Sequence, residues 1–303
     1  MMRVVVCIVG FNNLADVEQC LRALNKSEHR DFEVVICENG GARAVRALVD
    51  RLGSHLPCGQ AITIVDGGGN LGYAGGNNRC IAARSDADLW WILNPDTQPD
   101  PAAMGLLADH LAGGHADAAG GTLLSPGGRI QAYGGRWQRW AARPVSVGYG
   151  TQLGEAAPAA LPSIDYILGA SIMFTRHFLA VAGPMRDDYF LYGEEVEWCL
   201  RAKARGLRLG LVPAALIVHD QGSTTGAGGG FAARSRLVMY LDQRNKIHIL
   251  RDTAQAIMPF AALVALAALI INGVRKRAWP QLRHGLLGWL AGVAGRRGPP
   301  PWL

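Results

Sequence analysis

The sequence predicts an α/β fold with a mainly parallel central β-sheet. Its first hundred residues alternate four apolar, strand-like runs with segments whose leucines and valines recur at helical spacing. The short connections between these segments favour right-handed crossovers between parallel strands. The fourth run, residues 89–93, is stopped by Asn94-Pro95-Asp96. A carboxylate therefore follows a buried strand and is expected at the carboxyl edge of the sheet, where open sheets of this class bind their ligands.

The individual elements follow from this alternation. In the first part of the chain we expect strands at 3–9, 32–37, 61–65 and 89–93, and helices at 14–24, 43–52, 77–84 and 101–111. Residues 66–76 are interpreted as a long glycine-rich loop. The pattern weakens from 119 to 162, where irregular loops and short strands are expected. Beyond them we predict strands at 166–174, 207–212 and 216–218, helices at 176–182 and 194–205, and a polar loop from 219 to 230.

Composition narrows the class of protein. The 303 residues are half apolar, carry a net charge of +6 and enter strand character at once, so no signal peptide is expected. No cysteine belongs to a CxxC pair, which favours a reducing compartment without disulfides or a zinc site. Arg and Lys crowd the last third of the chain. This distribution favours an anionic membrane surface or an anionic substrate, and no nucleic-acid module pattern accompanies it.

The last part of the chain changes in character near residue 235. We therefore divide the sequence into 1–235 and a helical segment, 236–303. Residues 254–271 form an almost uncharged apolar run, and 279–293 place leucines among arginines. The tail either packs as a helical hairpin or lies in a membrane interface. We expect peripheral membrane contact through 254–297, and a membrane-spanning helix is less favoured.

Three groups of residues carry candidate chemistry. Asp96 is a candidate for holding a divalent metal against a nucleotide diphosphate, although Asn-Pro-Asp taken alone favours a simple turn. His219 leaves a strand end, as a metal ligand or a structural histidine would. Glu194 and Glu195 begin a helix, where carboxylates either complement the helix dipole or act as a general base.

The glycine-rich stretch allows two interpretations. Gly67, Gly69 and Gly72 satisfy G-x-G-x-x-G, which would indicate an NAD(P)-binding oxidoreductase. However, the motif follows the third strand, and no acidic residue ends a next strand at the expected distance. Alternatively, the glycines let the backbone approach a nucleotide while Asn70 and Asn77 offer amides to its hydroxyls.

Together these motifs resemble the family 2 glycosyltransferases of the GT-A fold, especially the bacterial rhamnosyltransferase-like branch. The resemblance spans roughly residues 3–250 and follows the family's order of motifs. It rests on VGFNN at 9–13, CENG at 37–40, GNLGYAGGNN at 69–78, LNPDT at 93–97, GAS at 169–171, FLYGEEVEWCLR at 190–201 and Val218-His219.

The resemblance implies a Rossmann-like, mainly parallel sheet and a role for each matching residue. Asp96 and His219 would coordinate Mg²⁺ or Mn²⁺ on the diphosphate of a dTDP- or UDP-sugar. Glu195 would take the proton from the acceptor hydroxyl, giving a single displacement with inversion. The nucleotide pocket would consist of Phe11, Asn12, Glu38, Asn70, Gly72 and Asn77, with Asn94 nearby.

Two departures bear on this assignment. The family's base is usually Asp, whereas the chain has Glu195, so Glu194 or Glu197 could share the work. Glu38 replaces another customary Asp, which leaves the nucleobase open. The expected enzyme transfers rhamnose or a similar sugar to a cell-surface glycan or lipid-linked acceptor at the cytoplasmic face of the membrane. A catalytically impaired sugar-nucleotide-binding protein is the alternative, and an oligomer is compatible with either.

Overall fold

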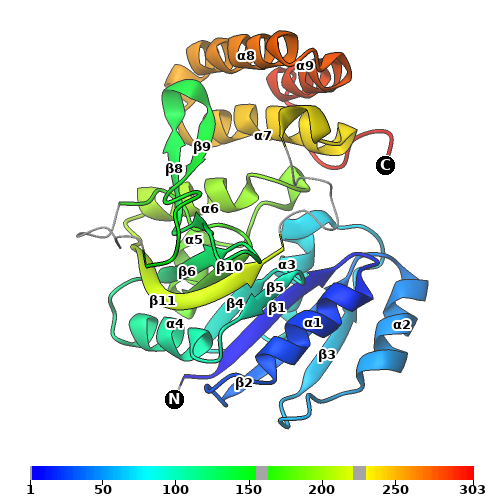
Figure 1. The fold of residues 1–303 in the computed structure, drawn as a ribbon, viewed down its shortest axis with the longest axis vertical. Coiled ribbons are helices and arrows are strands. Elements are labelled where there is room, and N and C mark those ends of the chain that lie inside the picture. The colour runs from blue at the N-terminus through cyan, green and yellow to red at the C-terminus, as the bar shows by residue number, and fades with distance from the viewer. Residues whose placement is uncertain (1, 155–162, 221–229) are drawn as a thin grey trace.

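The computed structural model describes residues 2–154, 163–220 and 230–303, and its first part is a parallel α/β unit (Figure 1). Strands β1 (Val4–Gly10), β2 (Phe32–Glu38), β3 (Ile62–Asp66) and β4 (Leu89–Leu93) are parallel, with Val4 of β1 paired to both Phe32 and Leu89. Helices α1 (Leu14–Leu24), α2 (Ala42–Leu52) and α3 (Gly72–Ala83) connect them. The predicted alternation is confirmed here.

The second part extends the sheet with mixed pairing. The full order is β3-β2-β1-β4-β10-β6-β11-β5, and β7 (Ile130–Ala132) pairs with β6. Strand β10 (Ser171–Thr175) is antiparallel to β4 and β6 (Ala118–Leu124), whereas β11 (Leu209–His219) is parallel to β6 and antiparallel to β5 (Thr97–Pro99). Helices α4 (Ala103–Ala112), α5 (Arg176–Ala182) and α6 (Glu194–Ala204) complete this part. The sheet is therefore mixed but mostly parallel, as the resemblance to the GT-A fold predicts.

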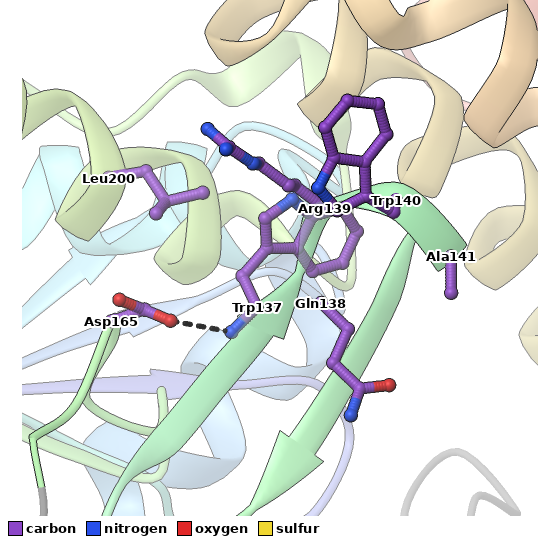
Figure 2. A pocket seen from close by; sticks show the side chains of 7 residues that line it. All are labelled: Trp137, Gln138, Arg139, Trp140, Ala141, Asp165 and Leu200. Atoms are coloured by element: carbon purple, nitrogen blue, oxygen red, sulfur yellow. Dashed lines mark hydrogen bonds between the residues drawn. The ribbon is translucent and has the colours of Figure 1, made fainter.

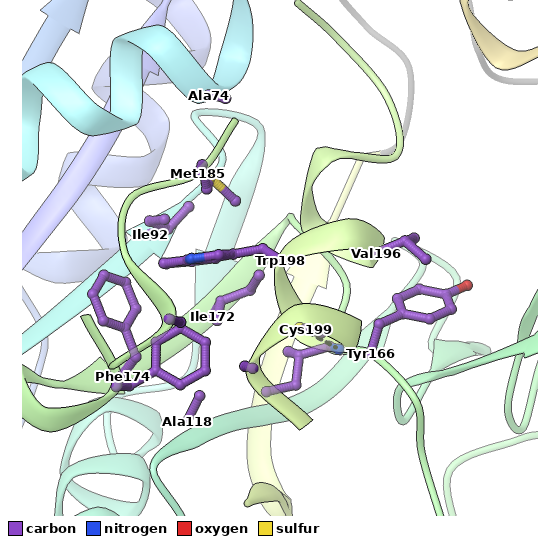
Figure 3. Close-up of a cluster of buried hydrophobic side chains, with 14 of the residues drawn as sticks. Ala74, Ile92, Ala118, Tyr166, Ile172, Phe174, Met185, Val196, Trp198 and Cys199 are labelled. Atoms are coloured by element: carbon purple, nitrogen blue, oxygen red, sulfur yellow. Dashed lines mark hydrogen bonds between the residues drawn. The ribbon is translucent and has the colours of Figure 1, made fainter. Parts of the chain in front are cut away.

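Helices cover both faces of this sheet. Alternate residues of β1 point to opposite sides, so that Val5 packs with α3, α5 and α6 while Val6 packs with α1, α2 and α4. Trp198 of α6 and Phe174 of β10, whose ring centroids lie 5.0 Å apart, belong to the core on the Val5 side of the sheet (Figure 3). The sheet thus has an apolar core on each of its two faces. This burial holds the strands and helices that end at the carboxyl edge of the sheet.

Several boundaries differ from prediction, among them the start of α3, which lies at Gly72 and not at residue 77. Strand β6 lies inside the stretch expected to be irregular, and its residues are all buried because β10 and β11 flank it. The predicted strand 166–174 is regular only from Ser171, and the two short strands after 206 form one strand interrupted by a bulge between Val212 and Leu216. Of the predicted polar loop at 219–230, residues 221–229 lie outside the described residues.

The helical end of the chain sits over one edge of the α/β unit (Figure 1). It consists of α7 (Arg236–Thr253), α8 (Met258–Arg275) and α9 (Trp279–Val293). A hairpin of β8 (Gly135–Gln138) and β9 (Arg143–Ser146) rises toward it, and its Trp140 ring contacts Phe260 of α8. The predicted helices are confirmed, and the division at residue 235 into separate domains stays a prediction.

Candidate functional site

A pocket of about 360 Å³ opens at the carboxyl edge of the sheet. It is lined from β1, the start of α3, the end of β4, the segment before α6, the end of β11 and the helical tail. Of the predicted site residues, it brings together Phe11, Asn70, Gly72, Asn94, Asp96 and His219. The residues that the motifs place at strand ends therefore converge on one cavity, as expected for an open α/β sheet.

Asp96 and His219 face each other in this pocket. The antiparallel pairing of β5 with β11 sets Thr97 opposite His219, and the Asp220 amide donates to the Asp96 carbonyl at 2.9 Å. As a result Oδ1 of Asp96 lies 3.4 Å from Nε2 of His219. Two residues more than a hundred positions apart in sequence are thus held at adjacent strand ends, and both side chains are largely buried.

Gln131 of β7 fixes the orientation of the His219 ring. Its amide nitrogen donates to the His219 carbonyl at 2.6 Å, so its amide oxygen must be the atom 2.9 Å from Nδ1. Nδ1 of His219 therefore carries a proton, and in the neutral ring the lone pair of Nε2 faces the Asp96 carboxylate. A lone pair opposite a carboxylate is a donor set that fits a cation. Sequence analysis missed Gln131, which belongs to no motif.

The described residues bring no third His, Cys, Asp or Glu to this pair. A carboxylate oxygen and one imidazole nitrogen suit Mg²⁺ or Mn²⁺, which usually keep several waters and share their coordination with substrate phosphates. The pair therefore fits a divalent cation that is held jointly with a diphosphate.

Asparagine side chains dominate the nucleotide side of the pocket. Asn70 accepts the Gly72 amide at 3.0 Å, and Asn94 keeps a buried amide oxygen that has no partner within the described parts of the chain. Asn13 and Asn39 also line the cavity, although sequence analysis did not select them. Asn39 donates to the Gly72 carbonyl at 2.8 Å and so ties β2 to the start of α3.

Three predicted nucleotide residues lie elsewhere. Glu38 is buried, and its carboxylate accepts the amides of Asn12 and Gly40 at 3.1 and 2.7 Å, so it shapes the two loops behind the pocket. Asn12, at a φ of 56°, belongs to that same arrangement. Asn77 is buried inside α3 and donates to the Tyr73 carbonyl at 3.0 Å. None of the three lines the cavity.

Asn77 lies inside α3 and not at its start, because α3 begins five residues earlier than predicted. Its first residue, Gly72, has a φ of 72°, and a Cβ there would lie 2.0 Å from the Phe190 carbonyl oxygen. A Cβ on Gly76 would lie 2.7 Å from Val9 of β1. These glycines therefore permit close contact of a helix with the sheet and with the loop before α6, and they are not signals of a loop.

The glutamate pair begins α6 next to the pocket wall. Glu195 is half-buried, and its Oε2 accepts the Gly193 amide at 3.1 Å. A Cβ on Gly169 would lie 3.7 Å from the Glu195 Cβ and 3.5 Å from the hydroxyl of Tyr73, a wall residue of the cavity, so Glu195 begins behind that wall and neither glutamate lines the cavity itself. Glu194 is 2% exposed, and its Oε2 has no partner in the described chain.

Burial governs the acidity of this pair. It raises the pKa of the Glu195 carboxyl, and burial together with the charge of Glu195 raises the pKa of Glu194 well above its usual range. Glu197, in contrast, binds Arg201 through both carboxylate oxygens at 2.8 and 3.0 Å. Its carboxylate is therefore engaged, and Glu194 and Glu195 are the carboxylates that could exchange protons.

The segment before α6 is strained and held by α7. Phe190 and Tyr192 have φ values of 68° and 72°, a region that L-residues rarely adopt. The Asn245 amide donates to three carbonyls of this segment, those of Tyr189, Leu191 and Tyr192, at 3.1, 2.8 and 2.6 Å. Arg244 is almost fully buried and adds a bond to the Tyr189 carbonyl at 2.7 Å. Sequence analysis missed both residues.

A mixed GT-A sheet with a carboxylate and a histidine at its carboxyl edge, over an asparagine-lined pocket, defines the class of nucleotide-sugar glycosyltransferases. Residues 5–159, half of the chain, match the family model described as glycosyl transferase family 2. The chain belongs to this family and is a glycosyltransferase that uses a nucleotide-sugar donor. The oxidoreductase interpretation is therefore wrong, because the chain belongs to a glycosyltransferase family.

Relatives and solved structures agree with this assignment. The chain is 23% identical to the low-salt glycan biosynthesis hexosyltransferase Agl10 of Haloferax volcanii, over 88% of this chain and 85% of that protein. It is 24% identical to an N-acetylglucosaminyl-diphospho-decaprenol L-rhamnosyltransferase of Mycobacterium tuberculosis, over 69% and 73%. A Pyrobaculum calidifontis mannosyltransferase in complex with GDP-Man and Mn²⁺ shares the fold, with a TM-score of 0.60, 14% identity and coverage of 97% and 88%.

Proposed function

We propose that the protein transfers rhamnose or a similar sugar from a dTDP- or UDP-sugar to a hydroxyl of a lipid-linked cell-surface glycan, with inversion. The observation that carries the proposal is the meeting of Asp96 and His219, 3.4 Å apart, in a pocket lined by asparagines beside the glutamates of α6. The name of the Haloferax relative supports a role in glycan biosynthesis, and that of the Mycobacterium relative supports rhamnose transfer to a sugar on a lipid carrier.

In this mechanism Asp96 and His219 would hold Mg²⁺ or Mn²⁺, because Gln131 keeps Nε2 of His219 free for a cation. When bound, such a cation would supply positive charge that offsets the negative charge growing on the leaving diphosphate. Phe11, 41% exposed at the pocket, offers a ring face to the base, and Asn70 and Asn94 offer amides to the ribose and diphosphate.

Glu195 acts as the general base. An acceptor hydroxyl is a weak nucleophile until a carboxylate removes its proton during attack. A pKa that burial raises makes Glu195 a stronger base once it is ionised. Attack from the side of α6 expels the diphosphate on the opposite side, so the anomeric configuration inverts.

A donor assay tests this function. Release of UDP or dTDP is measured from a panel of nucleoside-diphosphate sugars, with Mn²⁺, with Mg²⁺ and with a chelator. We expect release that depends on the metal. In Asp96→Asn, release with Mn²⁺ or Mg²⁺ should fall to the level measured with the chelator. Tight nucleotide binding without release in any combination would support the impaired sugar-nucleotide-binding protein instead, in which Glu195 remains turned onto the Gly193 amide.

The helical tail supports the membrane part of the proposal. Helix α8 turns its small residues inward, with Ala261, Ala265 and Gly273 buried, whereas Phe260 and Leu263 are 59% and 61% exposed. The segment Gln255–Arg275 is also apolar and long enough to cross a bilayer. Of its 18 most apolar consecutive residues, 28% are buried. A helix that faces water has the opposite pattern, with its large apolar residues inside.

Helix α9 repeats this inverted pattern. A Cβ on Gly288 would lie 2.1 Å from the Tyr240 carbonyl of α7, so the small face of α9 packs directly on that backbone. Leu287 and Leu290 are 42% and 56% exposed. Small residues between helices and large apolar residues outside are the arrangement of helices in lipid.

We therefore propose that α8 and α9 lie in the plane of the cytoplasmic membrane face. Three consecutive exposed cations, Arg275, Lys276 and Arg277, at the turn between the helices would meet anionic headgroups. Cosedimentation with phosphatidylcholine vesicles, with and without phosphatidylglycerol, tests this contact. We expect binding that phosphatidylglycerol strengthens and that Leu263→Ser with Leu290→Ser weakens. Equal recovery in the supernatant with and without vesicles would contradict it.

A further inference from the structure

A second pocket, of about 650 Å³, lies between the β8–β9 hairpin and α6. Figure 2 shows its two indole rings, Trp137 and Trp140, with Arg139 extending on the side of Leu200 and the carboxylate of Asp165 below. Gln138 and Ala141 complete the lining. None of these residues lines the nucleotide pocket, and Leu200 alone among them falls within a sequence motif, the one at 190–201.

The pocket is lined both by planar aromatic rings and by planar polar groups. Trp140 is 53% exposed, and the Arg139 guanidinium carbon lies 5.4 Å from the centre of its ring. Trp137 is 8% exposed, and its indole nitrogen has no hydrogen-bond partner within the described chain. Aromatic faces bury the C–H faces of sugar rings, and planar guanidinium, amide and carboxylate groups bind pairs of hydroxyls. This combination is suited to a carbohydrate.

The polar groups distinguish the pocket from the neighbouring apolar surface. Trp140 contacts Phe260 of α8 at 6.2 Å between ring centres, so the hairpin tip continues the exposed face of that helix. However, the carboxylate of Asp165 also lines the pocket, and it pairs with Lys203 at 2.9 Å. A carboxylate in the same pocket as two indoles favours a hydroxyl-rich ligand over acyl chains.

The backbone connects this pocket to the glutamate pair. Asp165 accepts the Trp137 amide at 3.0 Å, and four residues later Gly169 lies beside Tyr73 and Glu195. Leu200 is on the same helix as Glu195, about 7–8 Å further along its axis and about 140° around it at the usual helix geometry. A short oligosaccharide that reaches both sites would follow the surface of α6 from one side toward the other.

We propose that this pocket binds the glycan part of the acceptor, next to the sugar whose hydroxyl reacts. The inference rests on the proposed transfer to a glycan, and it names the subsite that would select that glycan. Because the hairpin tip adjoins α8, a lipid-linked acceptor would present its sugars to the pocket from the membrane side.

The test labels the protein with 5-fluorotryptophan and records ¹⁹F spectra, with Trp137→Phe and Trp140→Phe assigning the two resonances. The probes are methyl glycosides of glucose, galactose, rhamnose and N-acetylglucosamine and their β-linked disaccharides, with glycerol as the control. We expect saturable shifts at Trp137 and Trp140 only, larger for disaccharides. Trp140→Ala should also raise the KM for a glycan acceptor roughly tenfold, whereas Tyr149→Ala, 75% exposed and outside the pocket, should not.

Two outcomes separate this subsite from the proposed function. If the wild-type protein releases nucleotide from its donor but no sugar shifts either resonance, the subsite is wrong and the glycosyltransfer stands. If the sugars shift both resonances but no donor is turned over, the subsite stands and the proposed transfer is wrong. Equal shifts at all tryptophans would also overturn the subsite, because they report nonspecific contact.

Discussion

At the scale of residues, Gln131 decides which nitrogen of His219 faces Asp96. Replacing it by Leu removes the acceptor at 2.9 Å from Nδ1, so the ring can rotate or move its proton to Nε2. We expect Gln131→Leu to weaken Mn²⁺ affinity in the presence of UDP by about 10- to 100-fold, measured by calorimetry. Gln19→Leu, on the exposed side of α1, is the matched control. Unchanged affinity in Gln131→Leu would show that the amide does not orient the metal ligand.

The raised pKa of Glu195 predicts how the activity depends on pH. Burial raises its pKa, and a general base works only when ionised, so activity should fall with acid at a pH above the usual 4.5 of a glutamate. Glu195→Gln should lower kcat by about 10²- to 10⁴-fold and remove this acid limb from the profile. The measurement is kcat against pH at saturating donor. An intact acid limb in Glu195→Gln would assign the proton transfer to another group.

Glu194 makes the corresponding prediction for stability. Its folded-state pKa is raised, so the folded chain binds its proton more tightly than the unfolded chain. This contribution is complete below pH 4.5, the usual value, and is lost as the pH rises through the folded-state pKa. The melting temperature of Glu194→Gln should therefore fall less than that of the wild type when the pH is raised from about 4.5. Parallel curves would contradict the raised pKa.

Site residues that lie at strand ends could be predicted from the sequence. Asp96 and His219 each follow an apolar run, so their place at the sheet edge follows from strand polarity, and the structure brings them together. Asn77 could not be placed in this way. Its position depends on where α3 begins, and that start is set by contacts of Gly72 with Phe190, a residue more than a hundred positions away.

At the scale of elements, the same limit applies to whole strands and helices. The parallel part, from β1 to β4, could be predicted because each element carries its own periodicity. Strand β6 could not, because its sequence, AAGGTLL, has glycines where Ile167 and β11 pack closely. A Cβ on Gly121 would lie 2.2 Å from the Ala215 carbonyl oxygen of β11. Such glycines resemble loop signals until their neighbours are known.

Helix α7 should control catalysis through the segment before α6. Asn245→Ala leaves the carbonyls of Tyr189, Leu191 and Tyr192 without their common donor, while Phe190 and Tyr192 remain strained. We expect a loss of about 1–3 kcal/mol of stability and, below the melting temperature, a reduced kcat with little change in donor KM. Kinetics below the melting temperature separate the two effects.

The control for this prediction keeps the size of the side chain. Asn245→Asp retains the volume but replaces the donor by an acceptor opposite three carbonyls, so it should be as damaging as Asn245→Ala. Lys246→Ala removes the neighbouring side chain, which pairs with Asp242 at 2.6 Å, and should leave kcat unchanged. Full activity in Asn245→Asp would show that the amide does not hold the segment.

At the scale of the molecule, the tail has two roles that its sequence does not separate. Its outer face is apolar and exposed, whereas its inner face supports α7. Arg297 binds Asp252 at 2.7 Å, and Arg244 binds both the Gly298 carbonyl and the Tyr189 carbonyl near the site. Hydropathy predicts the outer face, but these polar contacts appear only once the chain end is folded back.

Truncation and surface substitution should therefore give different results. Deleting residues 254–303 removes α9 from α7 and takes the Gly298 carbonyl from Arg244 and the Arg297 guanidinium from Asp252, so we expect a lower melting temperature and loss of donor turnover, even in detergent without vesicles. Leu263→Ser with Leu290→Ser changes only exposed side chains, so the melting temperature and turnover of a soluble donor should remain, while vesicle binding falls. Differential scanning fluorimetry, nucleotide release and vesicle cosedimentation on the same preparations measure the three properties. A truncated chain with full turnover would show that the nucleotide site does not need the tail, whereas loss of turnover in the double serine variant would place its outer face in contact with the catalytic unit.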